Sequence, residues 1–126
     1  MIRLFFCMLF MHILDDYCLQ AFCLNNLKQK SWWRRQEKYS PLYKNDYIMA
    51  LIMHAFSWSF MISIPGIVLV PGFFESHWFI VAIVLNTFIH ASVDHIKANK
   101  FMINLVTDQL IHISQIFLTI SIISRV

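Results

Sequence analysis

The segment HWFIVAIVLNTFIHASVDHI, residues His77–Ile96, decides the fold of this chain. It has the length and the apolar content of a helix that crosses a bilayer, which takes about 20 mostly apolar residues. Three further segments meet the same requirement, namely Ile2–Leu24, Tyr47–Val70 and Phe101–Ile123. The sequence therefore predicts an all-α, polytopic membrane protein in which residues 1–126 form a single domain, a bundle of four transmembrane helices.

The composition supports a membrane protein rather than a soluble one. Hydrophobic residues make up 59% of the chain and charged residues 13%, with a mean hydropathy of +0.61, whereas charged residues are about a quarter of an ordinary soluble domain. The first segment carries polar residues within its apolar run and lacks a small-x-small cleavage site, so we expect a retained helix and no signal peptide. The net charge of +3 is small and localised, and no nucleic-acid partner is expected.

Most basic residues lie in one loop, NNLKQKSWWRRQEKYSPLYKND, residues Asn25–Asp46. A short interfacial helix that ends before Pro41 is one structure this loop could form. The brief turn Lys97–Lys100 adds two more lysines on the same side of the bundle. The positive-inside rule then predicts cytoplasmic basic loops and two periplasmic termini, in the inner membrane of a bacterium.

Ionisable residues recur inside the apolar segments, mostly one helical turn apart. They are His12 and Asp16, His54, His90 and Asp94, and Asp108 and His112. Residues at i and i+4 share a helical face, and each ionisable residue costs about 2.5 to 3.5 kcal/mol at membrane depth, which marks a functional site. A rise of about 1.5 Å per residue from the basic end of each span places one such residue of every span roughly 10 to 12 Å deep.

Imidazole and carboxylate groups from several helices are the ligands from which bundles build metal sites. The sequence thus predicts a site for one or two divalent ions, zinc, manganese or iron, with all seven residues as ligands. Gln20 and Gln109 are expected to orient ligands or substrate, and Lys97 with the basic loop to attract an anionic lipid headgroup or a phosphate. Asp15 points about 100° away from Asp16 and is expected to line the interior or to pair with a neighbour.

The polar positions also form an ordered set of motifs. They are H-x-x-x-D-Y-x-L-Q from His12, H-A from His54, H-x-x-x-D-x-x-K from His90 and D-Q-x-x-H from Asp108. In order and spacing they resemble the bacterial and phage membrane proteins catalogued as domain of unknown function 3307, in which Phe is more usual than Tyr17. The resemblance covers nearly the whole chain but implies no activity, because that family has none assigned. Its members look similar in style to membrane-bound metal-dependent hydrolases, an analogy of pattern alone.

Three functions fit these observations. The leading hypothesis is a metal-dependent hydrolase that acts on a lipid-linked or membrane-proximal substrate. The alternative is a non-enzymatic phage or bacterial accessory protein whose polar layer specifies helix pairing or partner binding. The third is a proton or ion conductor, against which stands the expected scarcity of polar residues in the half of the bundle away from the basic loops.

Overall fold

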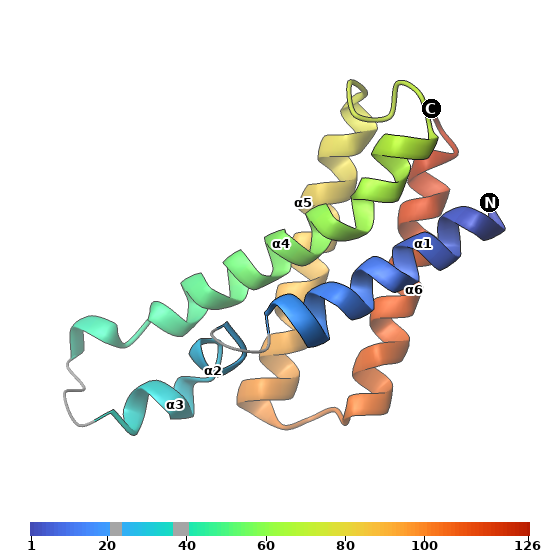
Figure 1. The fold of residues 1–126 in the computed structure, drawn as a ribbon. Helices are drawn as coiled ribbons and strands as arrows, with labels where there is room; N and C mark the ends of the chain where they lie inside the picture. Colours follow the sequence, from blue (N-terminus) through green and yellow to red (C-terminus); the bar gives the residue numbers. More distant parts are fainter. Residues whose placement is uncertain (21–23, 37–40) are drawn as a thin grey trace.

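The computed structural model describes residues 1–20, 24–36 and 41–126 (Figure 1). Within these ranges the regular structure is entirely helical, which confirms the all-α prediction. The α-helices are α1 (Ile2–Ile13), α2 (Leu24–Leu27), α3 (Lys30–Arg34), α4 (Asp46–Leu69), α5 (His77–His95) and α6 (Leu105–Ile123). The π-helices are η1 (Leu14–Leu19) and η3 (Ile96–Lys100), and η2 (Pro41–Tyr43) is a 3-10 turn.

Three helical stretches are long and apolar enough to cross a membrane, namely Pro41–Leu69, His77–Lys100 and Leu105–Ile123. Within the first segment residues 2–19 form α1 and its continuation η1, while residues 21–23 of the predicted span lie outside the described residues. The two helices together carry three charged residues: Arg3, Asp15 and Asp16. Because charged residues lower the apolar content that a span requires, this stretch does not reach the length and apolar content of the other three stretches. The structure supports three spans, and the fourth stays a prediction.

The last span begins later than its composition predicts. The π-helix η3 prolongs α5 through Lys100, and the chain then turns at Phe101, whose φ is +56°. Asn104 caps α6 by accepting a hydrogen bond from the backbone N–H of Thr107 at 2.9 Å. The predicted start at Phe101 is therefore wrong, because the apolar residues before the cap belong to the turn. Asp108 consequently lies in the first turn of α6, nearer the end of the bundle than predicted.

The helices α1, α4, α5 and α6 form the bundle, and both chain termini lie at one end of it (Figure 1). The opposite end holds α2, α3 and the turn between α5 and α6. Both basic segments therefore gather at the end away from the termini, as the alternation of the spans predicts. In place of one interfacial helix before Pro41 the described part of the loop contains two short ones, α2 and α3, while residues 37–40 lie outside that part.

The bundle is polar inside and apolar outside. Buried positions include His54, His90 and Asp94, each at most 3% exposed. Outward-facing positions include Phe88 at 73% and Ile80 at 65% exposure. An apolar surface of this extent is typical of a protein surrounded by lipid, whose helices satisfy their own backbone hydrogen bonds.

An apolar cluster closes the end of the bundle that holds the termini. It includes Leu4, Met8, Phe73, Ile116, Ile120 and Ile123. Gly66 of α4 lies against this cluster, and a Cβ added there would come within 2.6 Å of the Cδ1 atom of Ile123. The absence of a side chain at this position therefore permits a close approach of α4 and α6.

Candidate metal centre

Four segments of the chain deliver the polar cluster at the centre of the bundle. His54 comes from α4, His90 and Asp94 from α5, His112 from α6, and Asp16 from η1. The ring centroid of His90 lies 5.0 Å from that of His54 and 4.1 Å from that of His112. The structure thus brings together five of the seven predicted ligands, and η1 fits the tendency of π-helical turns to occur at functional sites.

The carboxylate of Asp94 lies between two histidines. Its Oδ2 atom is 3.0 Å from Nε2 of His54, and its Oδ1 atom is 3.6 Å from Nε2 of His112. The Nε2 atom of His90, one turn earlier on α5, is 4.0 Å from the same Oδ2. Both oxygens of one carboxylate therefore face imidazole nitrogens that are buried from solvent.

Two glutamines fix which nitrogen of each imidazole carries the proton. Oε1 of Gln20 contacts Nδ1 of His54, and Oε1 of Gln115 lies 3.1 Å from Nδ1 of His112. Because an amide oxygen can only accept, each Nδ1 carries a proton and donates to its glutamine, which leaves Nε2 as the nitrogen turned toward Asp94. Metal-binding histidines usually donate their second N–H to such a group. The assignment of Gln20 as a residue that orients a ligand fits this geometry.

A second layer of polar residues holds Gln20. Its Nε2 group donates to Oδ2 of Asp15, and the hydroxyl of Ser57 donates to Oδ1 of Asp15 at 3.1 Å. Asp15 is only 1% exposed. It therefore lines the interior and pairs with neighbours, as expected, and it supports His54 through the intervening glutamine.

His12 adjoins the cluster, but both of its nitrogens are engaged. The indole N–H of Trp58 can only donate, and it lies 2.8 Å from Nδ1 of His12. Nε2 of His12 therefore carries the proton and donates to Oε1 of Gln109 at 3.0 Å. No lone pair of His12 is free for an ion in this arrangement, and Gln109 contacts this histidine together with Asp108.

Trp58 organises the rings of the cluster, and the sequence analysis missed it. It is fully buried and stacks on His90 with ring centroids 4.3 Å apart and an interplanar angle of 25°. Trp58 follows His54 by four residues and so shares its helical face. That spacing is the signal from which this residue could have been identified.

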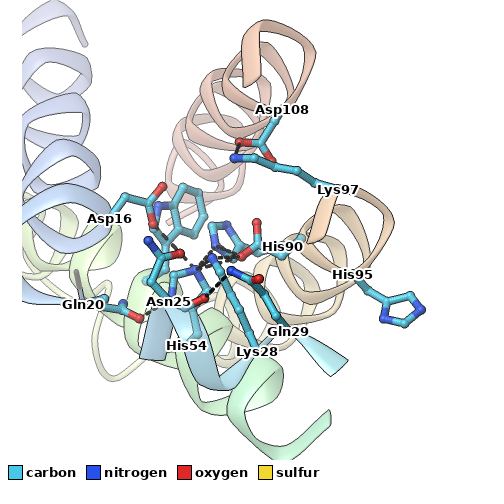
Figure 2. Close-up of polar contacts among 12 residues, drawn as sticks. Asp16, Gln20, Asn25, Lys28, Gln29, His54, His90, His95, Lys97 and Asp108 are labelled. Atoms are coloured by element: carbon cyan, nitrogen blue, oxygen red, sulfur yellow. Dashed lines mark hydrogen bonds and ion pairs between the residues drawn. The ribbon is translucent and has the colours of Figure 1, made fainter. Parts of the chain in front are cut away.

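Two lysines pair with aspartates of the cluster (Figure 2). The Nζ atom of Lys28 lies 2.5 Å from Oδ2 of Asp94 and 3.2 Å from Nε2 of His54. The Nζ atom of Lys97, for which we expected contact with substrate or a headgroup, lies 2.5 Å from Oδ2 of Asp108. Lys28 was missed because a lysine in a basic loop is first read as a topology signal.

Asp108 sits at the margin of the cluster. Its Oδ1 atom is 3.4 Å from Nε2 of His112, but Figure 2 shows its carboxylate turned toward Lys97. Gln109 also donates to its Oδ2 at 3.0 Å. Asp108 thus contacts one predicted ligand while its other oxygen is committed to a cation and an amide.

Two groups of three side chains present ligand atoms close enough to share one ion. They are Asp16, His54 and His90, and His90, Asp94 and His112, with ligand atoms within 4.8 Å of one another. Zinc bonds of about 2.0 to 2.1 Å in a tetrahedron require ligand atoms about 3.4 Å apart, so movements of about 1 Å would complete either group. Within the described part of the chain Asp16 Oδ1, Asp108 Oδ1 and His90 Nδ1 are buried without a hydrogen bond, as polar atoms that await a partner would be.

Polar contacts continue from the cluster toward the end that holds the termini. Nε2 of Gln115 donates to Oδ1 of Asn86 at 3.2 Å, and Nδ2 of Asn86 donates to Oγ1 of Thr119 at 2.7 Å. Asn86 and Thr119 are both fully buried. These contacts extend the polar interior from the cluster to the middle of α5 and to Thr119, and the apolar neighbours Ile116 and Ile120 flank their end.

The remaining histidines lie outside the cluster. His95 points away from it (Figure 2), and its ring stacks on Tyr47 with centroids 6.0 Å apart. His77 is exposed at the start of α5, at the other end of that helix. His95 therefore offers a matched control for substitutions of His90 on the same helix.

Comparison with known proteins gives one match. The model of the family described as "Protein of unknown function (DUF3307)" matches residues 4–125, a range that contains every residue of the cluster. No curated protein and no solved structure gives a significant match. The sequence resemblance is thereby confirmed, and the chemistry has to be argued from the cluster itself.

Proposed function

We propose that this chain, which belongs to the DUF3307 family of proteins of unknown function, is an integral membrane protein whose buried cluster binds a divalent metal ion. The observation that carries the proposal is the arrangement around Asp94. Nε2 of His54 and Nε2 of His112 face its two oxygens, while glutamines hold both Nδ1 atoms. Histidines in metal sites are usually oriented in this way, with the second ring nitrogen held by a hydrogen bond.

One ion suits the cluster better than two. The two groups of possible ligands share His90, and a neutral imidazole offers a single lone pair. His90 can therefore complete one group at a time. Zinc, manganese and iron all accept the mixture of imidazole and carboxylate that this cluster supplies.

A bound divalent ion would supply Lewis-acid activation of water, the basis of metal-dependent hydrolysis. Access for a substrate is supported by a cavity of about 240 Å³, the inner pocket, which is lined by Asn25, Lys28, Gln29, Asp94, Lys97, Ala98 and Phe101. This pocket reaches Asp94 from the basic end of the bundle. Within the proposal the substrate is a membrane-proximal molecule that enters there, and Asp94 and His54 lie where its reacting group would arrive.

The test is metal analysis of the detergent-purified chain after reconstitution with zinc, manganese and iron in turn. The variants are His90→Ala, which removes the residue shared by both ligand groups, and His95→Ala as its control on the same helix. We expect stoichiometric metal in the wild type and in His95→Ala, and a loss of at least tenfold in occupancy in His90→Ala. No metal in the wild type with any of the three ions would exclude the proposal.

One observation favours the alternative, a polar layer that specifies helix pairing. The ion pairs Lys28–Asp94 and Lys97–Asp108 already join separate elements and balance buried carboxylates without a metal. In this case Asp94→Asn should keep the fold and the biological activity, because an amide still hydrogen-bonds to Lys28 and His54. A metal site would lose both metal and activity in the same variant, so the two functions are separable.

A further inference from the structure

A second cavity, the outer basic pocket, lies beside the inner pocket at the same end of the bundle. Its volume is about 340 Å³, and Lys30, Ser31, Arg34, Arg35 and Asn99 contribute to its lining. Lys30 and Arg34 are one turn apart on α3 and so share a face of this helix. Three cationic side chains and a hydroxyl therefore border one hollow.

The cations of the outer basic pocket are not neutralised by carboxylates of the described residues. The ion pairs of that part of the chain use Lys28 and Lys97, whereas Lys30 lies over the ring of Tyr47 at 5.8 Å from its centroid. Like charges on one helical face destabilise it, and an anion that contacts all of them removes this cost. The guanidinium groups of Arg34 and Arg35 suit the paired oxygens of a phosphate group.

Hydrogen bonds fix the wall of this pocket against the bundle. Oδ1 of Asn99 accepts from the backbone N–H of Lys30 at 2.7 Å, and Nδ2 of Asn99 donates to the carbonyl of Lys28 at 3.1 Å. The indole N–H of Trp33 donates to the carbonyl of Leu27 at 2.7 Å. The backbone of the segment that carries the cations is thus attached to η3.

The two pockets are neighbours, since both are lined by Ala98 and Phe101. The outer basic pocket carries the unpaired cations, and the inner pocket reaches Asp94. A molecule whose phosphate occupied the outer pocket would therefore have its adjoining atoms at the entrance to the cluster.

We infer that the outer basic pocket binds the phosphate group of the substrate, so that the substrate class is a phosphate ester held at the membrane surface. This inference rests on the proposed function. It keeps the hydrolysis of that proposal and adds the place where the substrate binds. The chemistry that recognises the ligand is a phosphate group, whether it belongs to a lipid headgroup or to a free phosphate. General attraction of anionic lipids to a basic segment would, in contrast, depend on the number of charges and not on their position.

The experiment measures ligand binding to the intact, detergent-purified chain by native mass spectrometry. The probes are phosphatidic acid, inorganic phosphate and a diacylglycerol with the same acyl chains, which lacks the phosphate. Arg34→Gln with Arg35→Gln removes two charges from the pocket, and Lys44→Gln with Lys100→Gln removes two exposed charges from the same end but outside its lining. We expect at least tenfold weaker binding of phosphatidic acid to the first pair of substitutions and less than a twofold change in the second.

Equal losses in the two pairs of substitutions would overturn the inference, because they would indicate general charge attraction. Unchanged binding in the Arg34 and Arg35 pair, or equal binding of diacylglycerol and phosphatidic acid by the wild type, would overturn it as well. If inorganic phosphate competes with phosphatidic acid, a free phosphate is sufficient to occupy the pocket. If phosphatidic acid binds and inorganic phosphate does not compete, the pocket requires the lipid headgroup. Metal content separates the two proposals. If His90→Ala still binds phosphatidic acid, the outer basic pocket is supported independently of whether the chain binds a metal.

Discussion

The ammonium group of Lys28 lies 2.5 Å from Oδ2 of Asp94, on the oxygen that also faces Nε2 of His54 at 3.0 Å. A positive charge from the basic loop therefore occupies the place where an ion bound by these two residues would lie. The side chain of Lys28 is 13% exposed, and it borders the inner pocket. A metal ion and Lys28 accordingly compete for the same carboxylate.

Replacement of this lysine is predicted to strengthen metal binding. In Lys28→Met the competing charge is lost, and we expect the Kd for zinc to fall at least about tenfold, equivalent to about 1.4 kcal/mol. The apo form should unfold at a lower temperature, because Asp94 loses its buried partner, and added zinc should restore stability. Isothermal titration and thermal unfolding in detergent measure both effects. Lys97→Met is the control, since its partner Asp108 belongs to neither ligand group, and an equal gain in that variant would contradict the competition.

Loss of the amide that holds His54 is predicted to weaken the metal site without removing a ligand. Gln20→Leu leaves Nδ1 of His54 without its acceptor and frees the ring to change its tautomer. Partners of this kind typically contribute 10- to 100-fold to metal affinity, and we expect a loss of about that size. Gln36→Leu, at an exposed position, provides the control in the same titration. Full affinity in Gln20→Leu would show that the orientation of His54 does not depend on the glutamine.

The hydrogen bond from Trp58 to His12 is predicted to stabilise the bundle. Trp58→Phe keeps an aromatic ring against His90 but leaves Nδ1 of His12 buried without a donor, a loss of about 1 to 3 kcal/mol. We expect the midpoint of thermal unfolding in detergent to fall by several degrees. Trp32→Phe, outside the bundle, should change the free energy of unfolding by no more than about 0.5 kcal/mol. A similar midpoint for both variants would mean that this buried bond contributes little.

The close approach of α4 and α6 is predicted to make any side chain at Gly66 costly, and a larger one more costly. In Gly66→Ala the new Cβ would lie 2.6 Å from the terminal methyl group of Ile123, which a rotation can move, and 3.0 Å from Cε1 of Phe73, so a smaller loss of stability is expected. Gly66→Leu adds a branched side chain against both Ile123 and Phe73, and overpacking of this kind typically costs about 1 to 3 kcal/mol. Thermal unfolding of both variants compares the two costs. Equal stability of the leucine variant and the wild type would show that the helix ends separate freely.

Much of the site could be predicted from helical periodicity, because residues at i and i+4 share a face whatever surrounds the helix. The pairs His90 and Asp94, and Asp108 and His112, were found in this way. Lys28 could not be found, since it reaches the cluster from a loop whose course no periodicity describes. The sequence assigned an orienting role to Gln109 and none to Gln115, whose amide oxygen accepts a hydrogen bond from Nδ1 of His112 at 3.1 Å.

The sequence by itself determined the all-α class, three stretches able to span a membrane, and the helical faces that carry histidine and aspartate, because these depend on apolar length and on a fixed helical repeat. Only the tertiary structure decided that His54 and His112 face the two oxygens of Asp94, while His12 is taken up by Trp58 and Gln109. The reason is physical: which hydrogen-bond partner a side chain meets depends on the rotation and depth of neighbouring helices, and these are set by packing between segments that are distant in the chain.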